Sequence, residues 1–212
     1  MVCVPHFAGR EAAARASAIR ASPTLGLSSE ELYLEPTAAL SAVNTELQGG
    51  LSGDGIVKEG AGSLALSNCL VYAHPSNGVR VAAGTVSLVN CTIASNGYWG
   101  VTNGAGTVAA LNCIAWTNGL GGFTANCDLT YTCSQETHAG AGNRPDDPLF
   151  AGPATNNFRL TRSSPCVNAG WNGDWTKADR DLDGLPRLNA AAVDLGAYEC
   201  QLPSGGTLVV VR

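Results

Sequence analysis

The stretch "SLVNCTIASNG", residues 87–97, has two close counterparts in the same chain. "ALSNCLVYAHPSNG" occupies residues 65–78 and "AALNCIAWTNG" occupies residues 109–119, so the pair Asn-Cys recurs at a constant step of 22 residues. A repeat of this length predicts a unit that is too small to bury its own apolar face and must stack on its neighbours. The repeated pairs are Asn68 with Cys69, Asn90 with Cys91, and Asn112 with Cys113.

Side chains alternate in character on both sides of the repeated Asn. Val86 and Leu88 share one face before it, and Cys91 and Ile93 share one face after it. A period of two indicates strands rather than helices. Stacked units of this kind predict an all-β chain, folded over residues 49–136 as a right-handed parallel β-helix of about four rungs whose strands lie ~4.8 Å apart.

The Asn-Cys pair has a structural interpretation. Asn tolerates the left-handed backbone conformation that a sharp bend requires, and stacked Asn side chains can hydrogen-bond along a ladder. Cys69, Cys91 and Cys113 are interpreted as an inward column of small apolar side chains. The alternative is a metal site or a set of reactive thiols, but no His shares the 22-residue step.

The sequence changes on both sides of the repeat. Residues 1–48 include an Ala- and Arg-rich stretch, 9–22, which predicts a short helix in an N-terminal cap. Residues 49–136 contain six charged residues, whereas residues 137–200 contain fourteen. The second stretch is predicted to be a loop-rich C-terminal cap over the exposed end of the core. Residues 201–212 form a tail that ends in the β-prone "TLVVVR".

Four words follow the repeat in order: "DDPLF" (146–150), "FRLTRSSPCVNAG" (158–170), "DRDLDGLPR" (179–187) and "VDLGAYEC" (193–200). Together they resemble the C-terminal region of bacterial right-handed β-helix repeat proteins with a choice-of-anchor Q domain. The resemblance implies a secreted or cell-surface bacterial protein. It implies no particular biochemical activity.

The chain contains eight cysteines, which favours an oxidising compartment. Two pairs are candidates for disulfides, and a bridge in the first of them would pin the loop-rich C-terminal region. These are Cys166 with Cys200 and Cys127 with Cys133. The sequence does not fix this connectivity.

An acidic motif marks a candidate calcium site. Asp179, Asp181 and Asp183 alternate and are followed by Gly184, as at the start of an EF-hand loop. The twelfth loop position is Ala190 rather than Glu, so Asp194 or Glu199 would have to complete the coordination of Ca²⁺. The alternative is a turn in which the carboxylates accept backbone N–H groups and pair with Arg180 or Arg187.

Charge and hydropathy exclude two classes of partner. The net charge is -5 and the chain has no run of Lys or Arg, so we expect no nucleic-acid partner. No apolar run approaches the roughly 18 residues of a membrane helix, so we expect no membrane insertion.

The repeat offers few groups for catalysis. Lys58 and Arg80 are 22 residues apart and would form a lyase-like basic pair if they stacked on one face. A glycoside hydrolase would instead need two carboxylates at a defined separation. We therefore expect no catalytic residues. If the chain is an enzyme, the β-helix predicts a polysaccharide lyase or a glycoside hydrolase.

Four aromatic residues, Tyr72, Tyr98, Trp99 and Trp116, are expected near the coil surface. They either bind sugar rings or another protein, or they pack under a cap. We expect a non-catalytic extracellular module with a structural, adhesive or self-assembling role, whose partners are copies of itself or surface polysaccharide. The alternative is a carbohydrate-active β-helix, which would show charged side chains converging in a groove rather than an uncharged lateral face.

Overall fold

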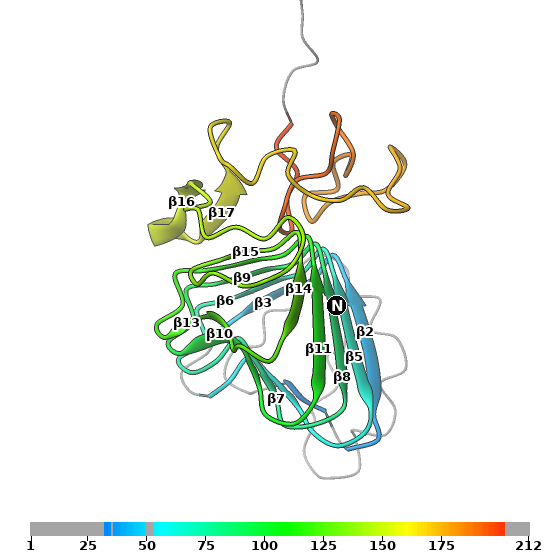
Figure 1. The fold of residues 1–212 in the computed structure, drawn as a ribbon, viewed down its shortest axis with the longest axis vertical. Coiled ribbons are helices and arrows are strands. Elements are labelled where there is room, and N and C mark those ends of the chain that lie inside the picture. The colour runs from blue at the N-terminus through cyan, green and yellow to red at the C-terminus, as the bar shows by residue number, and fades with distance from the viewer. Residues whose placement is uncertain (1–31, 35, 50–52, 202–212) are drawn as a thin grey trace, which may run out of the picture.

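The computed structural model describes residues 32–34, 36–49 and 53–201. The helix predicted at residues 9–22 and the tail beyond residue 201 lie outside this part of the chain. Within it, the chain folds as a parallel β-helix built from three parallel sheets of five strands each (Figure 1). The predicted all-β coil with a period of about 22 residues is confirmed.

Each turn of the coil contributes one strand to each sheet. The first sheet consists of β1 (Leu32–Leu34), β4 (Ile56–Lys58), β7 (Val79–Val81), β10 (Trp99–Asn103) and β13 (Gly121–Phe123). The second consists of β2 (Ala39–Val43), β5 (Ser63–Ser67), β8 (Thr85–Val89), β11 (Thr107–Leu111) and β14 (Asp128–Thr130). The third consists of β3 (Glu46–Gln48), β6 (Leu70–Tyr72), β9 (Thr92–Ala94), β12 (Ile114–Trp116) and β15 (Cys133–Ser134).

The coil begins before residue 49, the start that the repeat predicts. Strands β1, β2 and β3 pair in parallel with β4, β5 and β6 and form a complete additional turn. The step into the next turn is two residues longer than the repeat, because Ala42 pairs with Leu66 whereas Leu66 pairs with Leu88. This longer step moved Asn44 out of phase with the later Asn residues.

The interior of the coil is a continuous apolar core. Residues at equivalent positions stack in files, such as Leu64, Val86 and Val108, and all three are fully or almost fully buried. Contact between equivalent positions of successive turns closes the core, and the described residues contain no α-helix.

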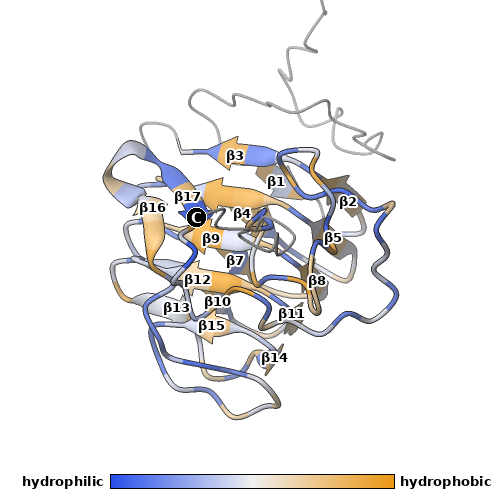
Figure 2. Cartoon of the chain, turned by 90° about the horizontal axis from the view of Figure 1, so that it is seen from above, coloured by the Kyte–Doolittle hydropathy of each residue, from blue (hydrophilic) through white to orange (hydrophobic). Residues whose placement is uncertain are grey.

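The C-terminal segment, residues 146–200, lies along the side of the coil. It includes the antiparallel strands β16 (Phe150–Gly152) and β17 (Asn157–Leu160), which flank the short 3-10 helix η2 (Pro153–Thr155). Figure 2 shows this segment over the third sheet. Phe158 packs on Tyr72 with ring centroids 5.4 Å apart, while Leu195 packs with Ile114.

The position of this segment differs from the predicted lid over the end of the core. The third sheet is apolar on its outward side as well as inside, as its fully buried β6 and β9 show. That outward surface requires a cover, and the C-terminal segment provides it. The end of the coil is instead extended by residues near Arg144, whose N–H and carbonyl bond to Thr132 and Ser134 of the last turn.

Candidate functional site

Asn68, Asn90 and Asn112 lie in one file along the corner between the second and third sheets. Their φ angles are 50°, 50° and 54°, so each occupies the left-handed conformation that the bend requires. Among the described residues, one side-chain bond joins two members of this file: Asn112 Nδ2 donates to Asn90 Oδ1 at 3.3 Å. The file has a further use beyond the bend and the ladder.

The amide groups of this Asn file hold the C-terminal segment against the coil. Each amide nitrogen donates to a backbone carbonyl of that segment: Asn68 to Arg180 (2.9 Å), Asn90 to Asp194 (3.3 Å) and Asn112 to Trp171 (2.9 Å). Asn112 Oδ1 also accepts the N–H of Trp171 at 2.8 Å. Three separate loops of the C-terminal segment are therefore placed in register with three successive turns.

The cysteines of the repeat form an inward file beside the Asn residues. Cys69, Cys91 and Cys113 are fully buried, and each thiol approaches the carbonyl oxygen two residues earlier, at 3.2–3.3 Å. Thr45 and Thr132 occupy the equivalent positions of the outer turns and make the same contact through their hydroxyl groups. A small donor at this position satisfies the carbonyl at the bend, which is a structural role.

The remaining cysteines are grouped differently from the predicted disulfide pairs. All seven cysteines of the described residues have free thiols. Cys133 packs in one apolar cluster with Cys166 and Cys200, and its thiol donates to the carbonyl oxygen of Asp146 at 3.0 Å. Cys127 packs against the coil interior instead. The structure thus brings Cys133 to Cys166 rather than to Cys127.

The four carboxylates of the predicted calcium site are occupied by protein partners. Two of the carboxylates are buried and accept backbone N–H groups: Asp181 from Leu185 and Glu199, and Asp194 from Asn168 and Cys200. Asp179 accepts the backbone N–H of Thr176. Asp183 forms an ion pair with Arg159. Among the described residues, no group of three or more His, Cys, Asp or Glu side chains is arranged to hold a metal ion. Calcium binding stays a prediction that this hydrogen bonding does not favour.

A buried charge cluster lies at the centre of the C-terminal segment. Arg187 is fully buried, donates to the carbonyls of Asp194 and Gly196, and lies 4.0 Å from the carboxylate of Glu199. Burial raises the pKa of Glu199 to about 8 and raises the pKa of Asp181 and of Asp194. These buried groups hold the loops of the C-terminal segment together and do not face solvent.

The predicted lyase-like pair is not formed. Lys58 is fully buried and its ammonium group donates to the carbonyls of Glu59 and Gly60. It pairs along the coil with Val81, whereas Arg80 pairs with Val57, because the step between these turns is one residue longer than the repeat. The two side chains therefore do not share a file.

The four predicted surface aromatics do not form one surface. Tyr72 is buried under Phe158, and Trp116 packs against the apolar cluster of the C-terminal segment. Tyr98 is 53 % exposed at the turn before β10, and Trp99 is half-buried in that strand. Tyr72 and Trp116 therefore pack under the C-terminal segment, which is the second of the two predicted roles.

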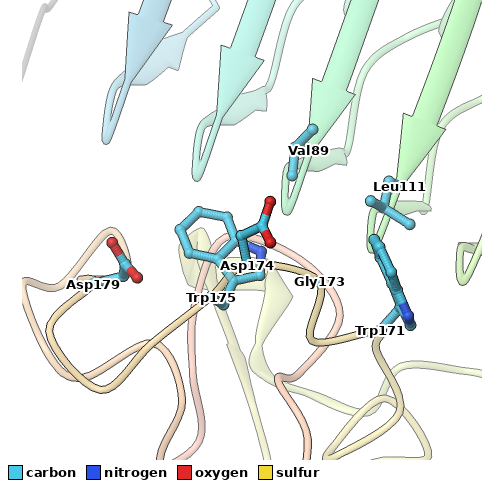
Figure 3. A pocket seen from close by; sticks show the side chains of 7 residues that line it. All are labelled: Val89, Leu111, Trp171, Gly173, Asp174, Trp175 and Asp179. Atoms are coloured by element: carbon cyan, nitrogen blue, oxygen red, sulfur yellow. The ribbon is translucent and has the colours of Figure 1, made fainter.

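Two other tryptophans line an open groove beside the Asn file. Val89 and Leu111, the last residues of β8 and β11, form one wall of this groove, whose volume is about 360 Å³. The opposite wall comes from the loop 171–179, with Trp171, Trp175 and the carboxylates of Asp174 and Asp179 (Figure 3). In the sequence, the two tryptophans stand out in "WNGDW" at residues 171–175. This stretch lies outside the 22-residue repeat, so the repeat does not predict that it packs beside the coil.

The outward face of the second sheet adjoins this groove. Its residues alternate with buried ones and are short: Ser63, Ala65 and Ser67 in β5, Thr85, Ser87 and Val89 in β8, and Thr107, Ala109 and Leu111 in β11. Within the five described strands of this sheet, Asp128 at the start of β14 is the only charged residue. The face is therefore flat and nearly uncharged over four turns.

Comparison with known proteins adds no family to this description. No family model matches the chain, and the searches of curated proteins and of solved structures returned no match. The described residues contain no helix with the length and apolar character of a membrane span.

Proposed function

We propose that the chain is a non-catalytic structural or adhesive module that associates with copies of itself through the outward face of the second sheet. The observation that carries this proposal is the run of short, uncharged side chains on that face. The resemblance to choice-of-anchor Q proteins supports a secreted or cell-surface location in a bacterium.

Self-association is favoured by the chemistry of the face. Protein interfaces are depleted of charged residues at their centre, because an unpaired charge loses its hydration there. A surface of Ser, Thr and Ala at regular intervals along the coil can approach a second copy closely over several turns. A two-fold arrangement would bring the same face of both copies together, which closes the assembly as a dimer.

The non-catalytic part of the proposal is supported by the use of the charged groups in the coil. Lys58 is buried against carbonyl oxygens, and Arg80 binds Asp54 at 2.6 Å. Proton transfer to a polysaccharide would require such groups to reach the substrate. Their present contacts stabilise turns of the backbone instead.

Sedimentation of the full chain over a range of concentrations tests this function. Ser87→Lys places a charge at the centre of the face, and we expect it to weaken self-association at least about tenfold, since an unpaired or like charge at an interface costs several kcal/mol. Ser163→Lys adds the same charge at an exposed position of the C-terminal segment and is the matched control. A chain that stays monomeric at high concentration, or turnover of any polysaccharide in a panel, would contradict the proposal.

A further inference from the structure

We infer that the groove between the Asn file and the loop 171–179 binds a neutral oligosaccharide chain. The inference rests on the proposed function. It adds a ligand to the non-catalytic module and places that ligand at the edge of the outward face of the second sheet. The groove combines two indole rings, two carboxylates and an aliphatic wall. Each of these parts matches one chemical feature of a pyranose ring.

Trp171 is held in place from both of its backbone groups. Its N–H and its carbonyl bond to the same side chain, that of Asn112, at 2.8 and 2.9 Å. The ring lies over Gly173, whose φ is +49° and where a Cβ would come within 2.9 Å of the indole. Trp171 is nevertheless 53 % exposed. The backbone of Trp171 is thus held on the coil and its ring lies against Gly173, while much of the indole surface stays open to a ligand.

An aromatic ring held in this way suits a sugar. The face of the indole carries partial negative charge, which attracts the weakly positive C–H groups of a pyranose face. Figure 3 shows Trp171 beside Leu111 at one end of the groove, and Trp175 further along. Two rings and the aliphatic side chains of Val89 and Leu111 provide apolar contacts along the groove.

The carboxylates provide acceptors for hydroxyl groups. Asp179 Oδ2 accepts the backbone N–H and the hydroxyl of Thr176, at 2.7 and 2.8 Å. These bonds lower the pKa of Asp179, so the group is ionised at neutral pH. Asp174 is exposed between the two tryptophans. Hydrogen bonds from hydroxyl groups to ionised carboxylates are about twice as strong as those between neutral groups.

Charge selects among oligosaccharides. Among the described residues that line the groove, two are acidic and none is cationic. A uronic acid chain would bring like charges together, whereas a neutral chain presents only hydroxyl groups. The groove chemistry therefore favours neutral sugars over acidic ones.

The loop that forms the groove follows the coil axis. Trp171 is bound to Asn112, and Arg180, at the other end of the loop, is bound to Asn68 two turns earlier. Two steps between parallel strands span about 10 Å. This length accommodates two consecutive pyranose rings, so the ligand is a chain rather than a single sugar.

Calorimetric titration of the full chain tests this inference. The probes are cellohexaose, mannohexaose and xylohexaose, with a hexamer of galacturonic acid and hexalysine as charged comparisons. We expect saturable binding of a neutral hexamer with a Kd below about 1 mM, weakened at least about tenfold by Trp171→Ala. Tyr98→Ala removes an equally exposed aromatic residue away from the groove and should leave the Kd unchanged.

Two further variants distinguish a loss of binding from a loss of folding. Gly173→Ala should weaken binding because its methyl group displaces the Trp171 ring. Asp179→Asn preserves the shape and should weaken the neutral hexamer at least about threefold while improving binding of the galacturonic acid hexamer. Thermal denaturation of each variant verifies that it is folded.

The possible outcomes separate this inference from the proposed function. It is overturned by a failure of all neutral hexamers to bind, by binding that survives Trp171→Ala, or by preferred binding of the acidic or the cationic probe. Ser87→Lys reports on self-association regardless of these results. Release of shortened or unsaturated sugar during the titration would overturn the non-catalytic function even where binding holds.

Discussion

The Asn file predicts a measurable difference between two chemically identical substitutions. Asn112 and Asn44 occupy equivalent bends with φ angles of 54° and 50°. Asn112 Nδ2 and Oδ1 bond to both backbone groups of Trp171, and Nδ2 also lies 3.3 Å from Asn90 Oδ1. Asn44 Oδ1 has no hydrogen-bond partner among the described residues. Replacement by Ala therefore removes the docking bonds of Asn112, whereas Oδ1 of Asn44 has no such bond to lose.

The expected magnitudes follow from these contacts. A net hydrogen bond contributes about 1 kcal/mol to stability, so the three bonds of Asn112 contribute about 3 kcal/mol. Ala in the left-handed conformation adds a cost of about 1 kcal/mol. We expect Asn112→Ala to lower the free energy of unfolding by about 4 kcal/mol and Asn44→Ala by about 1 kcal/mol. Asn112→Gly removes the bonds without the strain and should fall between them.

Urea denaturation, followed by far-UV circular dichroism, measures these three free energies. Amide exchange over residues 171–199 would show whether the C-terminal segment opens first in Asn112→Ala. Equal losses for Asn112→Ala and Asn44→Ala would refute the docking role of the file. Full stability of Asn112→Gly would refute the contribution of the hydrogen bonds and leave only the bend.

Three further predictions concern buried groups. The pKa of Glu199 is about 8 in the folded chain, well above the 4.5 that is usual for a Glu side chain, so between these pH values the folded state holds a proton that the unfolded state releases. The contribution of Glu199 to stability is complete below pH 4.5 and is lost as the pH rises to 8, by at most about 1.4 kcal/mol per pH unit. In Glu199→Gln, the free energy of unfolding measured by urea denaturation should therefore change less between pH 5 and pH 8. Refolding in oxidised glutathione should link Cys133 to Cys166, and peptide mass spectrometry that finds Cys127 linked to Cys133 instead would contradict the arrangement. Cys91→Thr should cost less than about 1 kcal/mol, because Thr makes the same contact in the outer turns, whereas Cys91→Leu should cost about 1–3 kcal/mol by overpacking, as melting curves would show.

The sequence predicted the coil well because its turns obey one physical requirement. Identical positions stack, so alternation and spacing survive in the residue order, as Leu66, Leu88 and Ala110 illustrate. The prediction weakened where a turn gains or loses residues. Asn44 is displaced by two residues, and the last bend uses Tyr131, with a φ of 47°, after a turn that is three residues shorter. Neither keeps the 22-residue step.

The candidate groove was harder to predict for a different reason. Trp171 and Trp175 lie in a loop with no periodic pattern, and their position depends on hydrogen bonds to Asn112, 59 residues earlier. The Asn residues were recognised as bends because that role is local. Their second role depends on which carbonyl groups reach the corner, and residue order carries no record of such contacts.

The bend and the groove are consequences of the same residue type at one corner. A left-handed bend turns the chain sharply and, at Asn68, Asn90 and Asn112, places an amide side chain where it bonds to the C-terminal segment. A segment that docks on these amides acquires the spacing of the coil, so its loops face fixed turns. Val89 and Leu111 belong both to the outward face of the second sheet and to the groove. The contact face and the groove therefore meet along one edge, and association through the face would set how open the groove is to a chain-like ligand.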